Sequence, residues 1–372
     1  MAKKQSYVGI DLGGSSLKVV ELKSVNNRPQ LVTYGFIDET YNIIKDDSPE
    51  ARRALAGHLK ELLKTSKVSS DRAISAMPSF SVFSSIISLP EMNKKDLISA
   101  VRWEAKKFVP IPLEEMILDW EILKEPGQAG INKEDLDDKK TGKKNKKDKD
   151  GESDNPPRKG NLKVLLTAAP KNLVNRYVEI FKEVGIQLVG LETESFALER
   201  SLVGNDRNPI MVIDIGSAST SIIIFSGGVP ILNRSIDVGG KNITKSLVDI
   251  MGLSEGQAEQ FKRDMGMAVM KEKIENLPEP VAYLINSIIN EVRYILNIYQ
   301  NQNKQPISKV IMTGGSSFLV NMTDYIQNIF NIKSFVGDPW ARVIHPVEID
   351  KMLKQLGPKL SVAIGLAMRE IV

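Results

Sequence analysis

One turn pattern is written twice in this chain, and it constrains the fold more than any other feature. Near the start, YVGIDLGGSSLKVVELK (residues 7–23) reads as an apolar strand, Asp11, a Gly-Gly-Ser-Ser turn and a second strand. In the second half, IMVIDIGSASTSIIIF (210–225) repeats this order with Asp214 in place of Asp11. A third segment, KVIMTGGSSFL (309–319), is a strand that ends in a Gly-Gly-Ser turn. The duplication predicts two related lobes that close on one ligand.

The composition of these turns is that of an anion-binding site. Glycine lets the backbone approach a ligand closely, and the N–H groups and hydroxyls of such turns bind phosphate oxygens. An aspartate at each strand end can hold Mg2+ through water, because this cation keeps much of its hydration shell. We therefore predict a nucleotide clamp with Asp11 and Asp214 at the magnesium ion. The predicted phosphate-binding residues are Gly13, Gly14, Ser15 and Ser16 from the first turn and Gly216, Ser217, Ser219 and Thr220 from the second.

Other readings of these turns are less specific. No G-x-x-x-x-G-K-[ST] loop occurs in the sequence. The residues after each turn alternate like a strand, whereas a dinucleotide fingerprint opens a helix. A single Ile-Asp-x-Gly turn is also what an ordinary β-hairpin uses for its geometry. Two copies followed by the strand-Gly-Gly-Ser segment favour the nucleotide clamp.

The three segments resemble the phosphate-1, phosphate-2 and adenosine motifs of the actin-like ATPase superfamily. Along almost the whole chain the sequence is similar to one FtsA-like branch of it, the PilM family of type IV pilus assembly. The closer resemblance lies in residues 89–123, in 189–202 and in the C-terminal VAIGLAMREIV (362–372). It implies an α/β, two-lobed actin-like (ribonuclease-H-like) ATPase fold, with an FtsA/PilM-type small α+β subdomain in the first lobe.

The resemblance also implies roles for further residues, with ATP or ADP and Mg2+ as ligands. Lys18 matches a lysine that contacts the phosphates, and Glu194 lies where a polar residue positions the attacking water. Their alternatives are a solvated strand lysine and an acid that favours a helix N-terminus. No strong general base is present, so any ATPase activity is expected to be slow. Predicted adenosine contacts are Gly314, Gly315 and Ser316, with Glu259 and Lys262 at the ribose and base or, alternatively, as an i, i+3 charge pair.

By the same resemblance, the protein is expected to be a cytoplasmic ATP-binding scaffold of the pilus inner-membrane complex. It would bind the N-terminal cytoplasmic peptide of a PilN-like membrane protein between its first-lobe subdomains, in a nucleotide-responsive way. Pilus motor ATPases, the platform protein and further copies of the chain are additional candidate partners. Membrane contact is expected only through partners, which makes the protein peripheral to the inner membrane.

Two other functions stay open. An FtsA-like filament protein would associate with the membrane through a C-terminal targeting helix, whereas this sequence stops directly after GLAMREIV. A sugar kinase is suggested by D-L-G-G-S-S-x-K, which resembles the hexokinase-type phosphate turn. The cysteine-rich zinc motif of many such kinases and a convincing sugar-facing catalytic aspartate are both missing from the sequence.

Composition excludes several other classes. The sequence has no cysteine, so disulfides, cysteine nucleophiles and thiolate metal sites are excluded. Its net charge of +4 gives no indication of a nucleic-acid partner. No apolar run is long enough to cross a bilayer, and no signal-peptide core precedes the first strand. Neither His58 nor His345 has metal-ligand spacing, so both are expected to be structural or surface residues.

The predicted first-lobe core comprises 1–70 and 192–208, and the small subdomain comprises 71–191. Inside the subdomain, 125–161 mixes lysines with acids and is predicted to be a disordered loop between two strands. A docking tail for an acidic partner or a membrane surface is the alternative. The second lobe is divided into a core at 209–250 and 305–372 and a helical part at 251–304.

Helix signals complete the prediction. A helix is expected to begin at Asn93, with Asp96 completing a capping box, and to place Leu97, Val101, Ala105 and Phe108 on one stripe. Further helices are expected at about 49–66, 170–185, 240–251, 254–266, 277–302, 318–330 and 358–371.

Overall fold

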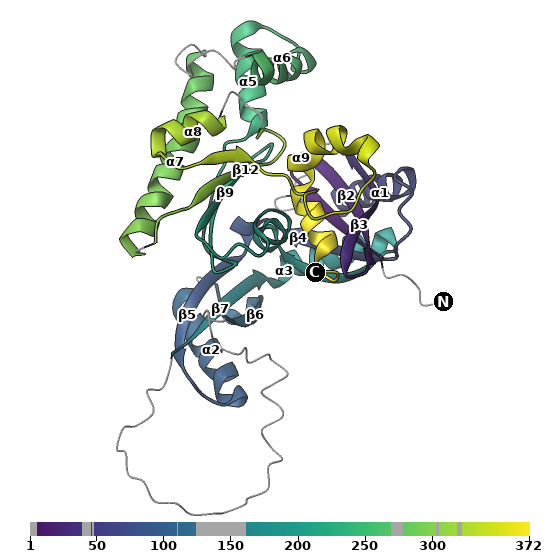
Figure 1. Ribbon diagram of the computed structural model, residues 1–372. Coiled ribbons are helices and arrows are strands. Elements are labelled where there is room, and N and C mark those ends of the chain that lie inside the picture. Colours follow the sequence, from purple (N-terminus) through teal and green to yellow (C-terminus); the bar gives the residue numbers. More distant parts are fainter. Residues whose placement is uncertain are drawn as a thin grey trace, which may run out of the picture. The chain divides into compact units, whose positions relative to one another are not determined.

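The computed structural model describes residues 6–38, 46, 48–109, 111–123, 161–268, 278–302, 305–317 and 322–372 (Figure 1). Apart from Asn161, the predicted insert at 125–161 lies outside the described residues. Contacts divide the chain into two compact units. One consists of Met1–Phe80 with Val174–Val372, and the other of Ser81–Leu173.

The first sheet of the larger unit has the strand order β3-β2-β1-β4-β8. The strand β1 pairs antiparallel with β2 and parallel with β4, and β4 pairs parallel with β8. Ser48 caps the helix α1 (Pro49–Thr65) by accepting the amide hydrogen of Ala51, as expected for a serine before a Pro-Glu start. The strands are β1 (Ser6–Gly13), β2 (Ser16–Val25), β3 (Arg28–Ile37), β4 (Arg72–Met77) and β8 (Gln187–Thr193).

The second sheet repeats this arrangement in the order β11-β10-β9-β12-β13. The antiparallel meander of β9, β10 and β11 is followed by parallel pairs of β12 with β9 and with β13. The predicted duplication of a turn between two strands is therefore a duplication of a whole sheet. Its strands are β9 (Ile210–Ile215), β10 (Thr220–Ser226), β11 (Val229–Ile236), β12 (Lys309–Thr313) and β13 (Ser334–Val336).

Apolar helices cover one face of the second sheet. The long helix α7 has a buried stripe that includes Val281, Ile288, Val292 and Ile295, and it shares one core with the inward side chains of β9 and β10. This stripe is therefore core packing. The helices on this side are α5 (Gly240–Met251), α6 (Glu255–Ala268), α7 (Glu279–Gln302) and α8 (Met322–Phe330), while 318–321 lie outside the described residues.

The last helix, α9, runs from Asp350 to Met368 and so begins eight residues earlier than the predicted start at Pro358. Proline removes one helical N–H, which made it a natural place to start the helix. In the structure, the Pro358 carbonyl accepts hydrogen bonds from the Gly314 amide (3.0 Å) and the Thr313 hydroxyl (3.1 Å). Both donors lie at the end of β12 or just after it, far from Pro358 in sequence, so sequence periodicity could not reveal these hydrogen bonds.

The helix α9 packs against β1, β2, β4 and the short helix α4 (Glu194–Leu198) (Figure 1). Two glycines permit this close approach. A Cβ atom at Gly9 would lie 2.0 Å from the Ala363 carbonyl oxygen, and one at Gly365 would lie 1.9 Å from the Ala197 carbonyl oxygen. The C-terminal segment that resembles the PilM family therefore contains the buried end of α9, Val362–Met368, followed by the more exposed residues 369–372.

The smaller unit is a three-stranded antiparallel sheet in the order β5-β7-β6, covered by the helix α2 (Lys94–Phe108). Asn93 caps α2 by accepting the Asp96 amide hydrogen at 3.0 Å, which confirms the predicted helix start. The strands are β5 (Phe83–Pro90), β6 (Met116–Leu123) and β7 (Asn161–Pro170); α3 (Lys171–Val184) spans the boundary between the units.

Two details of this region differ from the predictions. Phe108 belongs to the predicted stripe by spacing, but its side chain is 47% exposed, and Val109 joins Leu97, Val101 and Ala105 in the core. The compact unit is also narrower than the expected 71–191, because β4 and β8 pair within the first sheet. The boundary of the smaller unit is therefore set by pairing between β4 and β8, two strands that are far apart in sequence.

Candidate functional site

The first hairpin places two predicted residues in contact. Asp11 on β1 lies opposite Lys18 on β2, and the Lys18 Nζ atom is 2.7 Å from the Asp11 Oδ2 atom. Burial by itself would lower the pKa of Lys18, but Asp11, Asp214 and Glu194 together raise it above its ordinary value. Lys18 is therefore a fixed positive charge among three carboxylates, which does not fit the alternative of a solvated strand lysine.

The second hairpin is braced by backbone hydrogen bonds. The Gly216 amide donates to the Ser219 carbonyl oxygen, while the amides at the start of α5 donate to the Gly216 and Ser217 carbonyl oxygens. A Cβ atom at Gly239 would lie 2.5 Å from the Ser217 carbonyl oxygen, so only glycine fits there. The Thr220 hydroxyl donates to the Val238 carbonyl oxygen at 2.7 Å. This contact gives Thr220 a bracing role in the turn.

The two hairpins face each other. A Cβ atom at Gly14 would lie 3.7 Å from the Ala218 Cβ atom, so the tips of the two turns are in van der Waals contact range. Burial raises the pKa of Asp214 to about 6, with Lys18 opposing the increase and Asp11 adding to it. The predicted phosphate-binding turns thus meet, and their acidic residues share one electrostatic environment.

The third turn lies directly on the second hairpin. Gly314 has φ +91°, and a Cβ atom there would lie 2.4 Å from the Asp214 Oδ1 atom. The Ser316 amide donates to the Ile215 carbonyl oxygen at 3.1 Å. Glycine is required at 314 both for its backbone conformation and for the approach to Asp214.

Glu259 and Lys262 belong to the same cluster as Ser316. The buried Lys262 ammonium lies 2.5 Å from the Glu259 Oε2 atom and 2.9 Å from the Thr244 hydroxyl oxygen. A Cβ atom at Gly240 would lie 2.3 Å from the Ser316 Oγ atom and 3.3 Å from the Lys262 Nζ atom. The i, i+3 pair exists, but the lysine is not solvated as that alternative requires. Its position beside the third turn suits a nucleoside contact.

Glu194 is the first residue of α4. Its Oε2 atom accepts the Ser79 amide hydrogen at 3.4 Å. Burial raises the pKa of Glu194 to about 8, and Asp11 and Asp214 add to the increase. A helix N-terminus would favour the charged form and lower this pKa, so the helix-dipole alternative does not dominate. The Glu194 carboxyl is therefore close enough to Asp11 and Asp214 for their negative charges to raise its pKa.

A chain of polar contacts extends from this position to the second lobe, with Ser79 and Ser195 buried and Asn233 exposed. The Ser79 and Ser195 hydroxyl oxygens are 2.8 Å apart, and the Asn233 side-chain amide on β11 donates to Ser195 at 3.3 Å. The sequence analysis missed these three residues. No local pattern indicates them, because Ser79, Ser195 and Asn233 come together only in the folded chain.

Tyr177 on α3 is a second omission. Its side chain is completely buried, and its hydroxyl has no hydrogen-bond partner among the described residues. Burial raises the pKa of Tyr177 well above 10, and the charges of Glu194 and Asp11 contribute. The sequence predicts only a helix at about 170–185, and nothing in its pattern indicates a buried hydroxyl near the acidic residues.

The acidic residues fit a hydrated magnesium ion. Among the described residues, no group of three or more His, Cys, Asp and Glu side chains is placed to hold a metal. Two aspartates, one from each lobe and close enough for Asp11 to raise the pKa of Asp214, suit Mg2+ bound largely through its own water shell, since this ion rarely uses an all-protein cage. His345 is structural, as predicted, because its ring nitrogens contact the Val343 carbonyl oxygen (2.8 Å) and the Asp350 Oδ1 atom (3.1 Å).

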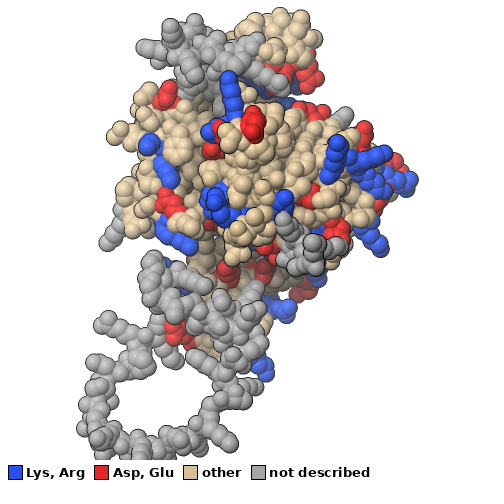
Figure 2. All heavy atoms as spheres, turned by 45° about the vertical axis from the view of Figure 1, so that its right-hand side comes forward, with Lys and Arg blue, Asp and Glu red and all other residues tan. Residues whose placement is uncertain are grey.

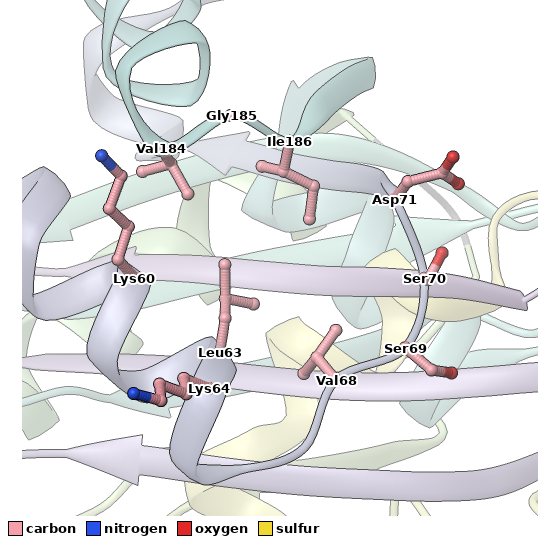
Figure 3. Close-up of a pocket in the computed structure, with 10 residues that line it drawn as sticks. All are labelled: Lys60, Leu63, Lys64, Val68, Ser69, Ser70, Asp71, Val184, Gly185 and Ile186. Carbon is pink, nitrogen blue, oxygen red and sulfur yellow. The ribbon is translucent and has the colours of Figure 1, made fainter.

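A separate pocket of about 340 Å³ contains none of the predicted site residues. Figure 3 shows apolar side chains, including Leu63, Val68 and Ile186, with Lys60 and Lys64 from α1 at its edge.

Figure 2 shows positive and negative side chains interspersed on the face in view. Across the part of the chain that the structure describes, no helix is both long and apolar enough to span a membrane.

The chain matches a known protein family over most of its length. A family model described as "Type IV pilus assembly protein PilM" matches residues 9–136 and 151–371. The cell division protein FtsA of Bacillus subtilis (strain 168) is 23% identical over 294 residues, which cover 74% of this chain and 61% of FtsA. The chain thus matches about three fifths of the length of that curated relative.

Solved structures confirm the predicted two-lobed actin-like fold. The structure "PilM-PilN type IV pilus biogenesis complex" is 23% identical with a TM-score of 0.79, and all of both chains is covered. MreB5 of Spiroplasma citri bound to AMPPNP is 13% identical with a TM-score of 0.50, covering 98% of this chain and 95% of MreB5. At these identities the likeness establishes the fold.

Proposed function

Because the chain belongs to the PilM family of type IV pilus assembly proteins, we propose that it is an ATP-binding, actin-like scaffold of the pilus inner-membrane complex. The observation that carries the nucleotide part is the meeting of two glycine turns around Asp11, Lys18 and Asp214. The AMPPNP-bound MreB5 structure, which has the same fold, supports a nucleotide in this position.

In this proposal each turn holds one part of ATP or ADP. Lys18 and the first turn bind the outer phosphates from one side, and the second turn binds them from the other. Mg2+, when bound between Asp11 and Asp214, offsets the charge of the phosphates. The phosphate-binding residues are Gly13, Gly14, Ser15, Ser16, Lys18, Gly216, Ser217 and Ser219, with Thr220 bracing the turn; Gly314, Gly315, Ser316, Glu259 and Lys262 receive the adenosine.

Glu194 is our candidate for positioning the attacking water. With a pKa of about 8 in the ligand-free protein, its carboxyl is mostly protonated at neutral pH. A protonated carboxyl can donate a hydrogen bond but cannot accept a further proton. We therefore propose at most a slow ATPase.

The raised pKa of Glu194 predicts that the ligand-free protein loses stability as the pH rises. The folded-state pKa is about 8 against an ordinary value of 4.5, so between these values the folded state holds a proton that the unfolded state releases. Glu194→Gln should therefore raise Tm by a few degrees at about pH 8 and by much less at about pH 5. Thermal melts across this range measure it, with the exposed Glu61→Gln as control. An equal shift at both pH values would contradict the assignment.

We further propose that a PilN-like inner-membrane protein supplies the main partner through its N-terminal cytoplasmic peptide. The solved PilM-PilN complex, whose fold this chain shares, supports this partner. The protein would then be cytoplasmic and peripheral to the inner membrane. Pilus motor ATPases, the platform protein and a homo-oligomer are further proposed contacts of the same assembly.

Isothermal titration with the N-terminal peptide of the PilN-like neighbour tests the partner. We expect saturable binding whose affinity changes by about fivefold or more when Mg-ATP is present, because typical coupling free energies are 1–3 kcal/mol. A peptide of scrambled sequence is the control. No binding with or without nucleotide, by a folded protein, would contradict the scaffold proposal. Equal affinities would contradict only its nucleotide response.

A filament is the second candidate, because the chain is similar to FtsA, a cell division protein. Light scattering distinguishes it from the scaffold. An increase that needs Mg-ATP and grows steeply with protein concentration would favour assembly of copies, while a constant signal would favour the scaffold.

A further inference from the structure

The outward face of α2 in the smaller unit has no role in the proposed function. Leu97, Val101 and Ala105 point into the core of this unit, with at most 1% of each side chain exposed. Side chains two positions along a helix lie on nearly opposite sides, so Trp103 is directed away from that core. It is 64% exposed.

Trp103 does not stabilise the core of its unit. Trp340 in the larger unit is 1% exposed, and Trp120 packs partly buried against the same core as α2. The structure instead places the Lys107 ammonium over the Trp103 ring, 4.3 Å from its centroid. A large aromatic side chain held outward in this way is a common feature of binding surfaces.

Positive charge surrounds this tryptophan. Lys95, Arg102, Lys106 and Lys107 are all exposed on α2. The two acids of the helix are both engaged locally: the Glu104 Oε1 atom is 2.7 Å from Lys107, and the Asp96 Oδ2 atom accepts a hydrogen bond from Asn93. The helix therefore presents a net basic surface with a tryptophan at its centre, which we call the Trp103 face.

We propose that the Trp103 face docks directly on the anionic phospholipid surface of a membrane. Tryptophan is favoured at the boundary between headgroups and acyl chains, and exposed lysines and arginines are attracted to anionic lipids. A single helix also presents a convex surface, which a lipid surface can accommodate without a matching groove. This goes beyond the proposed function, in which a partner alone holds the protein at the membrane.

The contact is expected to be weak. The exposed acids Glu114 and Glu115 follow α2 in the chain and reduce the local positive charge. A weak contact of this kind matters when a partner peptide already holds the protein nearby, because the second interaction then occurs at high effective concentration. Direct lipid binding should accordingly be sensitive to salt.

Vesicle sedimentation with the full chain tests the proposal. We expect the protein to sediment with vesicles of phosphatidylglycerol and phosphatidylcholine at low salt, and not with phosphatidylcholine alone. Lys95→Glu with Lys106→Glu should reduce the bound fraction by about tenfold or more, since each charge near the surface contributes. The matched control is Lys245→Glu with Lys351→Glu, which makes the same charge change at exposed positions on α5 and α9.

Fluorescence supplies a second readout. Binding should shift the tryptophan emission to shorter wavelength in the natural sequence and not in Trp103→Phe. Tyr283→Ala, which removes a 71% exposed aromatic side chain from α7, should leave sedimentation unchanged. Trp103→Ala should reduce it.

Two results would overturn the proposal. One is the absence of sedimentation with anionic vesicles at low salt, and the other is equal loss in the Lys95/Lys106 and Lys245/Lys351 variants. If the Lys95/Lys106 variant binds vesicles normally but loses a protein partner, the Trp103 face belongs to that partner. The peptide titration contains no lipid and the vesicle assay contains no peptide, so this proposal and the scaffold function can fail separately.

Discussion

Asp214→Ala and Asp11→Ala are each expected to weaken Mg-ATP binding by about 100-fold, or roughly 2.7 kcal/mol. Asp214 lies where the second and third turns meet, with its Oδ1 atom in the space that a Cβ atom at Gly314 would need. At about pH 8 its carboxyl is ionised, since its pKa is about 6. Alanine removes the negative charge that would hold the hydrated metal beside the phosphates.

Titration without magnesium separates a metal role from a general effect on the fold. Asp11 forms an ion pair with Lys18 and lies beside the predicted phosphate position. Removing Asp11 frees Lys18 and eliminates a negative charge that repels the nucleotide. In the presence of a chelator, the Asp11→Ala protein should therefore bind ATP at least as tightly as the natural protein.

The control for both variants is Asp249→Ala, an exposed acid on α5. Thermal melts should show that all three variants fold. Calorimetric titration of the natural protein and of the three variants, with Mg-ATP and then with ATP plus chelator, gives the affinities needed. Unchanged Mg-ATP affinity in both aspartate variants would remove the metal assignment, and equal losses with and without magnesium would point to a structural role.

The site was predictable from sequence where its chemistry is local. Asp11 and Gly13–Ser16 are consecutive, and the same order recurs at Asp214 and Gly216–Thr220, so the chain itself displays the pairing. Duplication also predicted the related sheets, because each copy contains a turn between two apolar strands. The family resemblance added Lys18, Glu194, Glu259 and Lys262, which a local pattern alone would not single out.

The remaining features depend on contacts between distant segments. Tyr177 approaches the site from α3, far from any of the three turns in sequence, and Asn233 contacts Ser195 from β11. Phe108 fits a helical stripe by spacing, but α2 ends there and Val109 fills the core. Pro358 predicts a helix start, but α9 begins earlier, and the Pro358 carbonyl oxygen accepts a hydrogen bond from the Gly314 amide just after β12. In each case the deciding contact comes from tertiary packing.

Gly365→Ala is expected to destabilise the protein by about 3 kcal/mol or more, at the upper end of the range for overpacked interiors. The new Cβ atom would lie 1.9 Å from the Ala197 carbonyl oxygen and 2.5 Å from its carbonyl carbon. Both are backbone atoms, so α9 and α4 must separate to make room. The Arg200 side chain, which donates to the Gly365 carbonyl oxygen at 2.9 Å, would move with them.

Gly57→Ala is the matched control and should have the opposite sign. Gly57 lies inside α1, and a Cβ atom there would meet nothing within 4 Å. Alanine should stabilise the helix by about 0.5–1 kcal/mol, because it loses less backbone freedom on folding. Urea denaturation of the two variants measures the difference. An unchanged midpoint for Gly365→Ala would show that α9 does not pack this closely on α4.

Gly365→Ala is also expected to affect the nucleotide site. The Pro358 carbonyl on α9 accepts the amide hydrogen of Gly314, and Gly314 in turn lies against Asp214. A displaced α9 would therefore move the third turn away from the predicted adenosine position. We expect folded Gly365→Ala protein, measured at low temperature and without denaturant, to bind Mg-ATP more weakly than the natural protein, while Gly57→Ala retains full affinity. Normal affinity in a destabilised Gly365→Ala protein would show that the third turn is held by β12 alone and not by α9.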